Sequence, residues 1–415
     1  MAYKDLRIKR KRLRASLEEM AKIGATTRGG VGRLALSVED KLARDLFVKW
    51  LKELKLEVRI DDMGNIFGNR PGRHNNLSCI MSGSHLDSQP KGGRCDGTLG
   101  VIGALEVLRT LDEAKIVTHR PITIVNWTNE EGTRFAPGLL GSGVWTGKFG
   151  NAWAYERTDA YGKKLGSELE MIGYKGNLST GQWPVHAYYE LHIEQGPILE
   201  GQGKIIGSPL GVVCRHHYDV EVEGTANQVG PTPMEGRNDA LCTAAEMVLR
   251  VNELPDKMGG NMVATVGRIE NFPNSRNVIP AKVFFHVDIR SWDEDLAIRG
   301  WDDVQNDFQT IAEKRGCRIR MEITQRAERT VFSEQLVRRV LGIADRLEYT
   351  SHGVMVSGAG HDACNMSGIT PTAMIFVPSI GGRSHAEAEN TTWEDCEAGV
   401  NILLQCILQS ASEEK

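Results

Sequence analysis

The chain has 415 residues, with 50 Lys and Arg against 54 Asp and Glu and a formal net charge of -4. This length favours two domains, and the even mixture of charges argues against nucleic acid as the main partner. No apolar stretch approaches the roughly 20 residues that span a bilayer, which argues against a membrane partner. No secretory signal opens the chain, and its eight cysteines form no Cys-x-x-Cys pair, so we expect a cytoplasmic protein with reduced cysteines.

Residues 7–14 carry a basic run that could be a flexible arm or a targeting peptide. An apolar stripe through the same segment can share one helix face, and Glu18 and Glu19 follow at once. The stripe consists of Leu6, Leu13, Leu17 and Met20. We interpret the basic run as the solvated face of the first helix.

The next part of the chain alternates short apolar runs with helical patterns, which is typical of a largely parallel α/β sheet. We expect a helix at residues 99–111, where apolar residues recur at helical spacing. Buried strands are predicted at residues 79–82, 122–127, 187–192 and 372–377.

The middle of the chain predicts a second domain. Its elements are expected in the order strand 218–223, helix 239–252, strand 262–269, strand 282–289, helix 302–314 and strand 318–324. This β-α-β-β-α-β order is that of a ferredoxin-like sandwich. We therefore place an inserted domain at residues 213–330, within an α/β domain made of residues 1–212 and 331–415.

Histidines and acids collect where the strands of the α/β part end. Four different strands each end at such residues or are followed by them. The residues are His85 with Asp87, the pair Glu130 and Glu131, His192, and His385. In open α/β sheets ligands bind beyond the carboxyl ends of the strands, so we expect these side chains to meet at one edge.

Asp96 completes this set from a glycine-rich loop before the helix at 99–111. Imidazoles and carboxylates suit zinc, manganese or a related divalent ion. Five ligands are too many for one catalytic zinc, and they suit two ions that share one carboxylate, which we predict to be Asp96.

The adjacent acids Glu130 and Glu131 suggest a division of roles, in which Glu131 binds metal and Glu130 stays free to accept a proton. Asp87 is placed to hydrogen-bond the imidazole of His85. A single histidine is more often structural than a ligand, so the prediction depends on the combined pattern. The chain has no Gly-x-Ser-x-Gly elbow, no His-Glu-x-x-His and no P-loop.

Six sequence blocks resemble the N-carbamoyl-L-amino-acid hydrolase family, which includes β-ureidopropionase and allantoate amidohydrolase and belongs to the dinuclear aminoacylases and carboxypeptidases. The resemblance covers nearly the whole chain. The blocks are GSHLDSQPKGGRCDGTLGV (83–101), NWTNEEGTRFAPGLLGSGVW (126–145), LHIEQGPILE (191–200), NSRNVIPAKVFFHVDIRS (274–291), SGAGHDA (357–363) and GGRSHAEAE (381–389).

The resemblance implies an exopeptidase-like catalytic domain that binds two divalent ions (Zn, Mn, Co or Ni), and an inserted lid domain that also forms a homodimer. One ion would be held by His85, Asp96 and His192, and the other by Asp96, Glu131 and His385. Glu130 would act as general base and later as proton donor.

The same resemblance implies the residues that select the substrate. Asn277 and Arg290 of the inserted domain would grip a substrate carboxylate, for which an arginine fork is well suited. Gln195 resembles a further substrate contact, and His361 resembles a residue of the substrate pocket.

One position departs from the family pattern. Where the family usually has Asn-His-Ala-Gly, this chain has Asn227-Gln228-Val229-Gly230. The family histidine reaches the opposite site of the closed dimer and polarises the scissile carbonyl. Gln228 can donate a hydrogen bond but carries no charge, and losing such a donor can cost about 100- to 1000-fold in turnover.

The expected activity is metal-dependent hydrolysis of the carbamoyl C–N bond of N-carbamoyl-L-amino acids, which yields the amino acid, ammonia and carbon dioxide. A β-ureidopropionase or allantoate amidohydrolase activity is the nearest alternative, because pocket shape decides between such substrates. A catalytically impaired metal-binding homologue is the further alternative that Gln228 raises.

Overall fold

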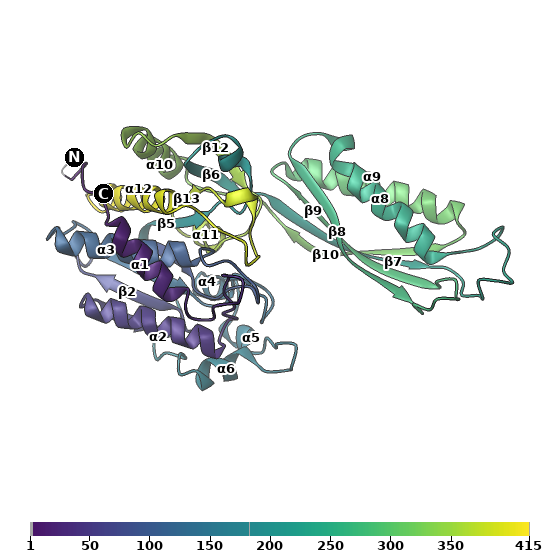
Figure 1. Ribbon diagram of the computed structural model, residues 1–415, viewed down its shortest axis with the longest axis horizontal. Coiled ribbons are helices and arrows are strands. Elements are labelled where there is room, and N and C mark those ends of the chain that lie inside the picture. The colour runs from purple at the N-terminus through teal and green to yellow at the C-terminus, as the bar shows by residue number, and fades with distance from the viewer. Residues whose placement is uncertain (1–2, 182, 415) are drawn as a thin grey trace. The chain divides into compact units, whose positions relative to one another are not determined.

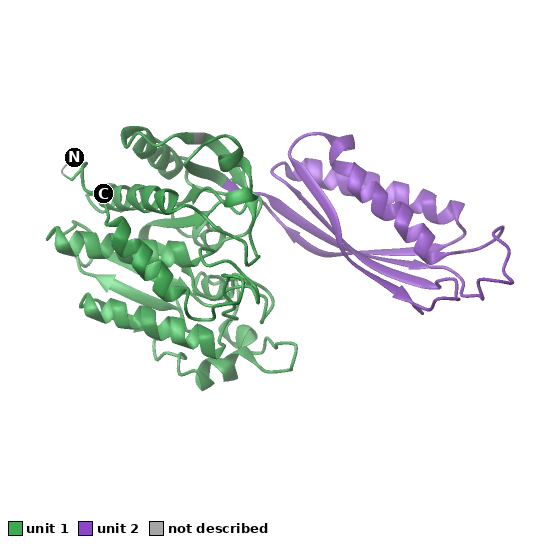
Figure 2. Cartoon of the chain, in the orientation of Figure 1, with its two compact units in different colours: residues 1–210, 331–415 green, residues 211–330 purple. Residues whose placement is uncertain are grey.

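The computed structural model describes residues 3–181 and 183–414. The chain divides into two compact units, residues 1–210 with 331–415 (unit 1) and residues 211–330 (unit 2), which Figure 2 colours green and purple. None of the helices in these described residues is long and apolar enough to cross a membrane.

Unit 1 is built on a mixed sheet, which has nine strands among the described residues. Neighbouring strands follow the order β1-β2-β4-β3-β5-β13-β6-β11, and β12 pairs with β6. The central neighbours β4, β3, β5 and β13 are parallel, whereas β1, β2 and β6 join antiparallel. The bounds are β1 Glu57–Ile60, β2 Ile66–Arg70, β3 Cys79–His85, β4 Ile122–Trp127, β5 Val185–Ile193, β6 Ile206–Val212, β11 Thr330–Val331, β12 Ser351–Ser357 and β13 Thr372–Val377.

The central strands confirm the parallel core that the apolar runs predicted. Every residue of β3, β4 and β13 is buried, as expected for parallel strands with helices on both faces. β4 and β13 have the predicted bounds, and β3 and β5 extend a few residues beyond theirs.

Helices cover both faces of the unit 1 sheet. Leu191 of β5 packs against Gly100 of α3 and Gly399 of α12, whereas its neighbour Glu190 accepts a hydrogen bond from Ala363 in α11 on the opposite face. Figure 1 shows α1, α3 and α12 side by side. The helices are α1 Arg10–Met20, α2 Val38–Glu53, α3 Thr98–Glu113, α4 Leu140–Trp145, α5 Asn151–Tyr155, α6 Leu165–Met171, α7 Ile198–Gly201, α10 Glu334–Arg346, α11 Asp362–Ser367 and α12 Trp393–Ser410, with a 3-10 turn η1 at Ile380–Gly382.

The basic run near the N-terminus lies on α1, as predicted. Leu13, Leu17 and Met20 are buried, but Leu6 precedes the helix. Four side chains of the basic run, those of Lys9, Arg10, Arg12 and Arg14, form ion pairs within unit 1, and Arg12 makes a two-bonded fork onto the buried Glu106.

Unit 2 has the predicted β-α-β-β-α-β order and is an antiparallel four-stranded sheet with strand order β10-β7-β9-β8. β7 and β9 alternate strictly between buried and half-buried residues, so one face packs on α8 and α9 and the other face is polar. The bounds are β7 Cys214–Glu223, α8 Ala240–Met258, β8 Met262–Phe272, β9 Lys282–Ser291, α9 Glu294–Lys314 and β10 Arg318–Ala327.

Helix α9 corrects one expectation, because it begins at Glu294 and not near Asp302. The side chain of Asp293 accepts a hydrogen bond from the Leu296 N–H and caps the helix there. Ala297 and Trp301 are buried in the first turns, so tertiary packing extends the helix toward its N-terminus.

Candidate metal centre

Two sets of metal-binding side chains meet at the carboxyl edge of the central strands of unit 1. His85, Asp96 and His192 form one set, and Asp96, Glu131 and His385 form the other. The ligand atoms within each set lie within 4.8 Å of one another. The structure therefore brings together all five residues that the strand ends suggested as ligands.

Asp96 belongs to both sets and turns one oxygen toward each. Its Oδ1 lies 3.1 Å from His192 Nε2 and 3.8 Å from His85 Nε2. Its Oδ2 lies 3.4 Å from His385 Nε2, and the same nitrogen is 3.4 Å from Glu131 Oε2. This is the arrangement of a carboxylate that bridges two cations.

The imidazoles of the first set are oriented as metal ligands. His85 Nδ1 is bonded to the Asp87 backbone carbonyl at 2.8 Å, and His192 Nδ1 to the Ile193 carbonyl at 2.9 Å. When Nδ1 donates to a carbonyl, Nε2 keeps its lone pair, and both Nε2 atoms face Asp96. Burial lowers the pKa of His192, but the hydrogen bond and the charge of Asp96 outweigh this effect and raise the pKa to about 9. The position next to Asp96 Oδ1 therefore attracts a cation strongly.

The acids of the site are consistent with bound cations. Burial, followed by the charges of Asp96 and Asp87, raises the pKa of Glu131 well above its usual value. Its Oε1 is buried and has no hydrogen-bond partner among the described residues. Divalent ions would supply both the missing partner and the opposing charge, and this set of nitrogen and oxygen ligands suits Zn, Mn, Co or Ni.

Glu130 lies beside the ligands but belongs to neither set. Its Oε2 is 3.4 Å from His85 Nε2, and the side chain is buried. Burial, and then the charges of Asp362 and Glu131, raise the pKa of Glu130 well above its usual value. A buried carboxyl that belongs to neither ligand set is available to accept a proton and to return it.

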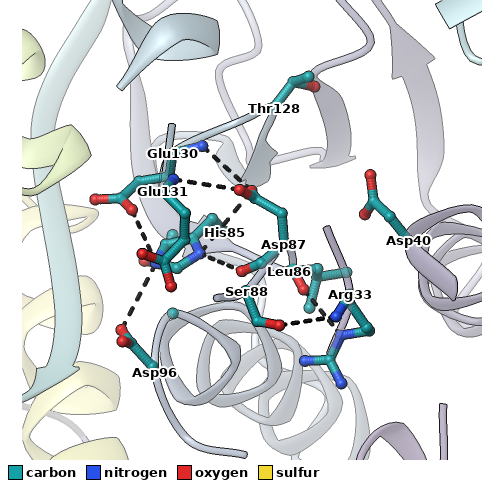
Figure 3. A network of polar contacts seen from close by, with 12 residues as sticks. Arg33, Asp40, His85, Leu86, Asp87, Ser88, Asp96, Thr128, Glu130 and Glu131 are labelled. Atoms are coloured by element: carbon teal, nitrogen blue, oxygen red, sulfur yellow. Dashed lines mark hydrogen bonds and ion pairs between the residues drawn. The ribbon is translucent and has the colours of Figure 1, made fainter. Parts of the chain in front are cut away.

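Asp87 has a different contact from the one predicted. Its carboxylate lies 4.0 Å from His85 Nδ1, beyond hydrogen-bonding distance, because it accepts the backbone N–H groups of Glu130 and Glu131 at 3.2 Å each. Its backbone carbonyl orients the imidazole instead. Figure 3 shows Asp87 in contact with both His85 and the backbone of the acid pair, so it fixes the base as well as the ligand.

The turn before α3 needs glycine at Gly97. Its φ is +60°, and a Cβ there would lie 2.3 Å from His85 Nε2. The chain can therefore pass directly beneath the ligand ring, which places Asp96 opposite His85.

Gln195, Ser384 and Glu389 hold Asp96 in place. The Gln195 amide donates to Asp96 Oδ2 and to Ser384 Oγ, each at 3.0 Å. Glu389 accepts from the Asp96 N–H and from Ser384 Oγ, each at 3.1 Å. Sequence reasoning missed Ser384 and Glu389, although both lie in the block that contains His385.

His361 is buried behind His192, with ring centroids 4.5 Å apart, and its Nε2 lies 3.1 Å from Ser357 Oγ. With Glu190 and His192 it forms a third set of possible ligands. However, the Glu190 carboxylate already accepts from Ser84 Oγ, the Tyr188 hydroxyl and the Ala363 N–H. The carboxylate of this third set is therefore already engaged in hydrogen bonds within the protein.

The remaining candidates lie in unit 2. Arg290 is on the polar face of the sheet, where its guanidinium contacts Asp288 at 2.8 Å. Asn277 and Gln228 are on adjacent loops, joined by a hydrogen bond of 3.0 Å from the Val229 N–H to the Asn277 carbonyl. Gln228 is exposed.

A cavity of about 520 Å³ in unit 1 lies away from the candidate metal ligands. It opens at the amino-terminal ends of β3 and β4, where Cys79, Thr123 and Trp183 line it. The ligands lie at the other ends of these strands, so the cavity is separate from the metal centre.

Comparisons with known proteins agree on one family. The model of peptidase family M20/M25/M40 matches residues 81–409. The chain is 41% identical to N-carbamoyl-L-amino-acid amidohydrolase of Rhizobium meliloti over 98% of this chain and 97% of that protein. It is 34% identical to allantoate amidohydrolase of Bacillus subtilis over 95% and 96%. A crystal structure of an amidase of the hydantoinase/carbamoylase family from Burkholderia multivorans matches with a TM-score of 0.93 and 44% identity, covering 99% of each chain.

Proposed function

Because the chain belongs to peptidase family M20/M25/M40, as a metal-dependent amidohydrolase of the hydantoinase/carbamoylase amidases, we propose that it hydrolyses the carbamoyl C–N bond of N-carbamoyl-L-amino acids. The products would be the amino acid, ammonia and carbon dioxide. The observation that carries this proposal is the position of Asp96 between two ligand sets, with the free carboxyl of Glu130 beside them.

The chemistry follows from this arrangement. Two divalent ions at the ligand sets would polarise the ureido carbonyl and lower the pKa of a water molecule. Glu130 removes a proton from the attacking water, since its carboxyl is not needed as a ligand. It then returns the proton to the nitrogen of the leaving amino acid, and the carbamate that is released decomposes to ammonia and carbon dioxide. Asp87 keeps the Glu130 backbone in position throughout.

Substrate recognition would come from unit 2, where Arg290 offers a fork for the substrate carboxylate. Arg290 and Asn277 lie at opposite ends of β9. Arg290 is near the end of the strand, where it pairs with Arg215 of β7, and Asn277 lies before Lys282, the first residue of the strand. Eight residues of strand separate Lys282 from Arg290, or about 26 Å at roughly 3.3 Å per residue. Both side chains can contact one substrate molecule only if they come from different subunits.

This separation supports the proposed homodimer. β8 is an edge strand of the unit 2 sheet, and its long, weakly charged sequence exposes Val263 and Ile269. The other edge strand, β10, carries Arg318, Arg320 and Glu322, which discourage strand pairing. We propose that β8 joins two subunits, so that Asn277 and Gln228 of one subunit serve the metal centre of the other.

A substrate panel tests the proposed function. The metal-free protein is reloaded in turn with Mn²⁺, Co²⁺, Ni²⁺ and Zn²⁺, and ammonia and free amino acid are measured. The substrates are N-carbamoyl-L-amino acids with different side chains, N-carbamoyl-β-alanine, allantoate and N-acetyl amino acids. We expect the N-carbamoyl-L-amino acids to be hydrolysed fastest. Turnover confined to allantoate would reassign the substrate, and no turnover with any metal would favour the impaired homologue that Gln228 raises.

A further inference from the structure

Arg33 is buried behind the metal centre, with only 1% of its surface exposed. Its Nε donates to the Leu86 carbonyl at 2.9 Å, and its Nη2 donates to the Thr98 hydroxyl at 2.8 Å. Leu86 follows the ligand His85, and Thr98 comes two residues after the ligand Asp96. One planar guanidinium therefore joins the two stretches of chain that carry these ligands.

The backbone of the same segment is paired with the loop that leads to Asp96. Arg33 donates its N–H to Ser88 Oγ, and its carbonyl accepts the Ser88 N–H, each at 2.8 Å. Two residues earlier, Val31 and Gly92 exchange two hydrogen bonds of 2.9 Å. The loop between His85 and Asp96 is thus held at several points along its length.

Gly30 brings this segment close to the loop of the second ligand set. A Cβ at Gly30 would lie 2.5 Å from the Gly92 carbonyl oxygen and 2.8 Å from Glu387 Cα, two residues after His385. Neither Gly30 nor Arg33 falls within residues 81–409, which the family model matches. The segment therefore lies outside the part of the chain that the family model matches and that supplies the ligands.

Among the described residues, no carboxylate forms a hydrogen bond or an ion pair with the Arg33 guanidinium. Its remaining donors reach the carbonyls of Ile23 and Met20, at 3.1 and 3.4 Å. Burial lowers the pKa of Arg33 to about 10, and the charges of Asp40 and Asp87 raise it, so the group stays charged at neutral pH. In Figure 3 Arg33 lies on the opposite side of Asp87 from the acid pair.

We propose that Arg33 is a positioning residue of the metal centre, which sets the spacing of His85 and Asp96 by bridging Leu86 and Thr98. The inference deepens the proposed function, because it concerns the metal site on which that function rests. A lysine would keep the charge, but its single ammonium group lacks the planar fork that spans both acceptors.

Metal binding to the metal-free protein tests this role without any substrate. Mn²⁺ is titrated by calorimetry, and the visible absorption of bound Co²⁺ reports the ligand geometry. Arg33→Lys should raise the dissociation constant for Mn²⁺ about 10- to 100-fold, as changes to groups that orient ligands do, and it should alter the Co²⁺ spectrum. Thr98→Val, which removes one acceptor at constant shape, should act in the same direction.

Arg120→Lys is the matched control. Arg120 is also buried and donates to backbone carbonyls, those of Glu413 and Ser78, at the opposite end of the sheet. The substitution Arg120→Lys should lower the melting temperature without changing Mn²⁺ affinity or the Co²⁺ spectrum.

Two results would overturn the proposal. One is wild-type Mn²⁺ affinity in Arg33→Lys, or in Thr98→Val if the lysine variant does not fold. The other is an equal loss of affinity in Arg120→Lys, which would mean that any buried arginine supports the site through general stability. Failure of the substrate panel with these titrations intact would instead remove the proposed substrate and leave the role of Arg33 standing.

Discussion

Replacing Glu130 by glutamine separates proton transfer from metal binding at this site. The amide has the shape of the carboxyl group, and Glu130 belongs to neither ligand set, so both metal ions should still bind. It cannot take a proton from water or return one to the leaving nitrogen. Its neighbours Asp96 and Glu131 belong to the ligand sets and cannot replace it. General acid–base catalysis contributes about 100- to 10,000-fold, so the barrier should rise by roughly 3–5 kcal/mol.

The assay for Glu130→Gln combines turnover with a metal count. Amino acid release from the best substrate of the panel is measured, and bound metal is quantified after gel filtration. Glu194→Gln is the matched control, because Glu194 is 7% exposed against 8% for Glu130 but caps α7 through the N–H groups of Ile198 and Leu199. Turnover of Glu130→Gln within about tenfold of wild type, with two ions bound, would refute the assignment of Glu130 as the base.

Four further outcomes are expected. A chelator should abolish turnover and lower the melting temperature, and excess metal at about 1000 times its dissociation constant should restore roughly 4 kcal/mol of stability for each bound ion; full activity without metal contradicts the proposed chemistry. Arg12→Met should reduce the free energy of unfolding in urea by about 3 kcal/mol, because it leaves the buried Glu106 unpaired, and the double variant Arg12→Met/Glu106→Met should recover most of the loss. Val263→Lys should convert the proposed homodimer to monomer in light scattering, and an unchanged dimeric mass would contradict the assignment of β8 as the interface. Gln228→His should change kcat far more than metal affinity. A rise in kcat would indicate an impaired site, and a fall in kcat would indicate a site adapted to glutamine. An unchanged kcat would place Gln228 outside the reaction.

The fold was predictable from sequence where burial is uniform or strictly alternating. β4 and β13 are mostly apolar and buried throughout, and β7 and β9 alternate, so these patterns identified them. β6 escaped prediction because Ile206–Val212 contains two glycines and a proline, which are poor strand residues. Helix α12 escaped because, from Cys396 onward, almost all of its residues are buried, which removes the polar face that marks a helix.

The ligands were predictable because strand ends converge on one edge of the sheet, but their supports were not. Glu389 hydrogen-bonds the Asp96 N–H across 293 positions of sequence, and local pattern carries no trace of such a contact. Arg33 likewise reaches Leu86 and Thr98 only after the chain has folded. The backbone carbonyl of Asp87, which orients His85, is a group that every residue possesses.

The two ends of unit 2 leave unit 1 at neighbouring points. Unit 2 spans residues 211–330, and on either side of it the Phe332 N–H donates to the Leu210 carbonyl at 2.7 Å. A short turn could close that gap in the unit 1 sheet, where β6 and β11 are adjacent. In evolutionary terms unit 1 is a complete host for the candidate metal ligands, into which a gene segment that encodes unit 2 could be inserted, exchanged or removed without rewriting the chain that carries those ligands.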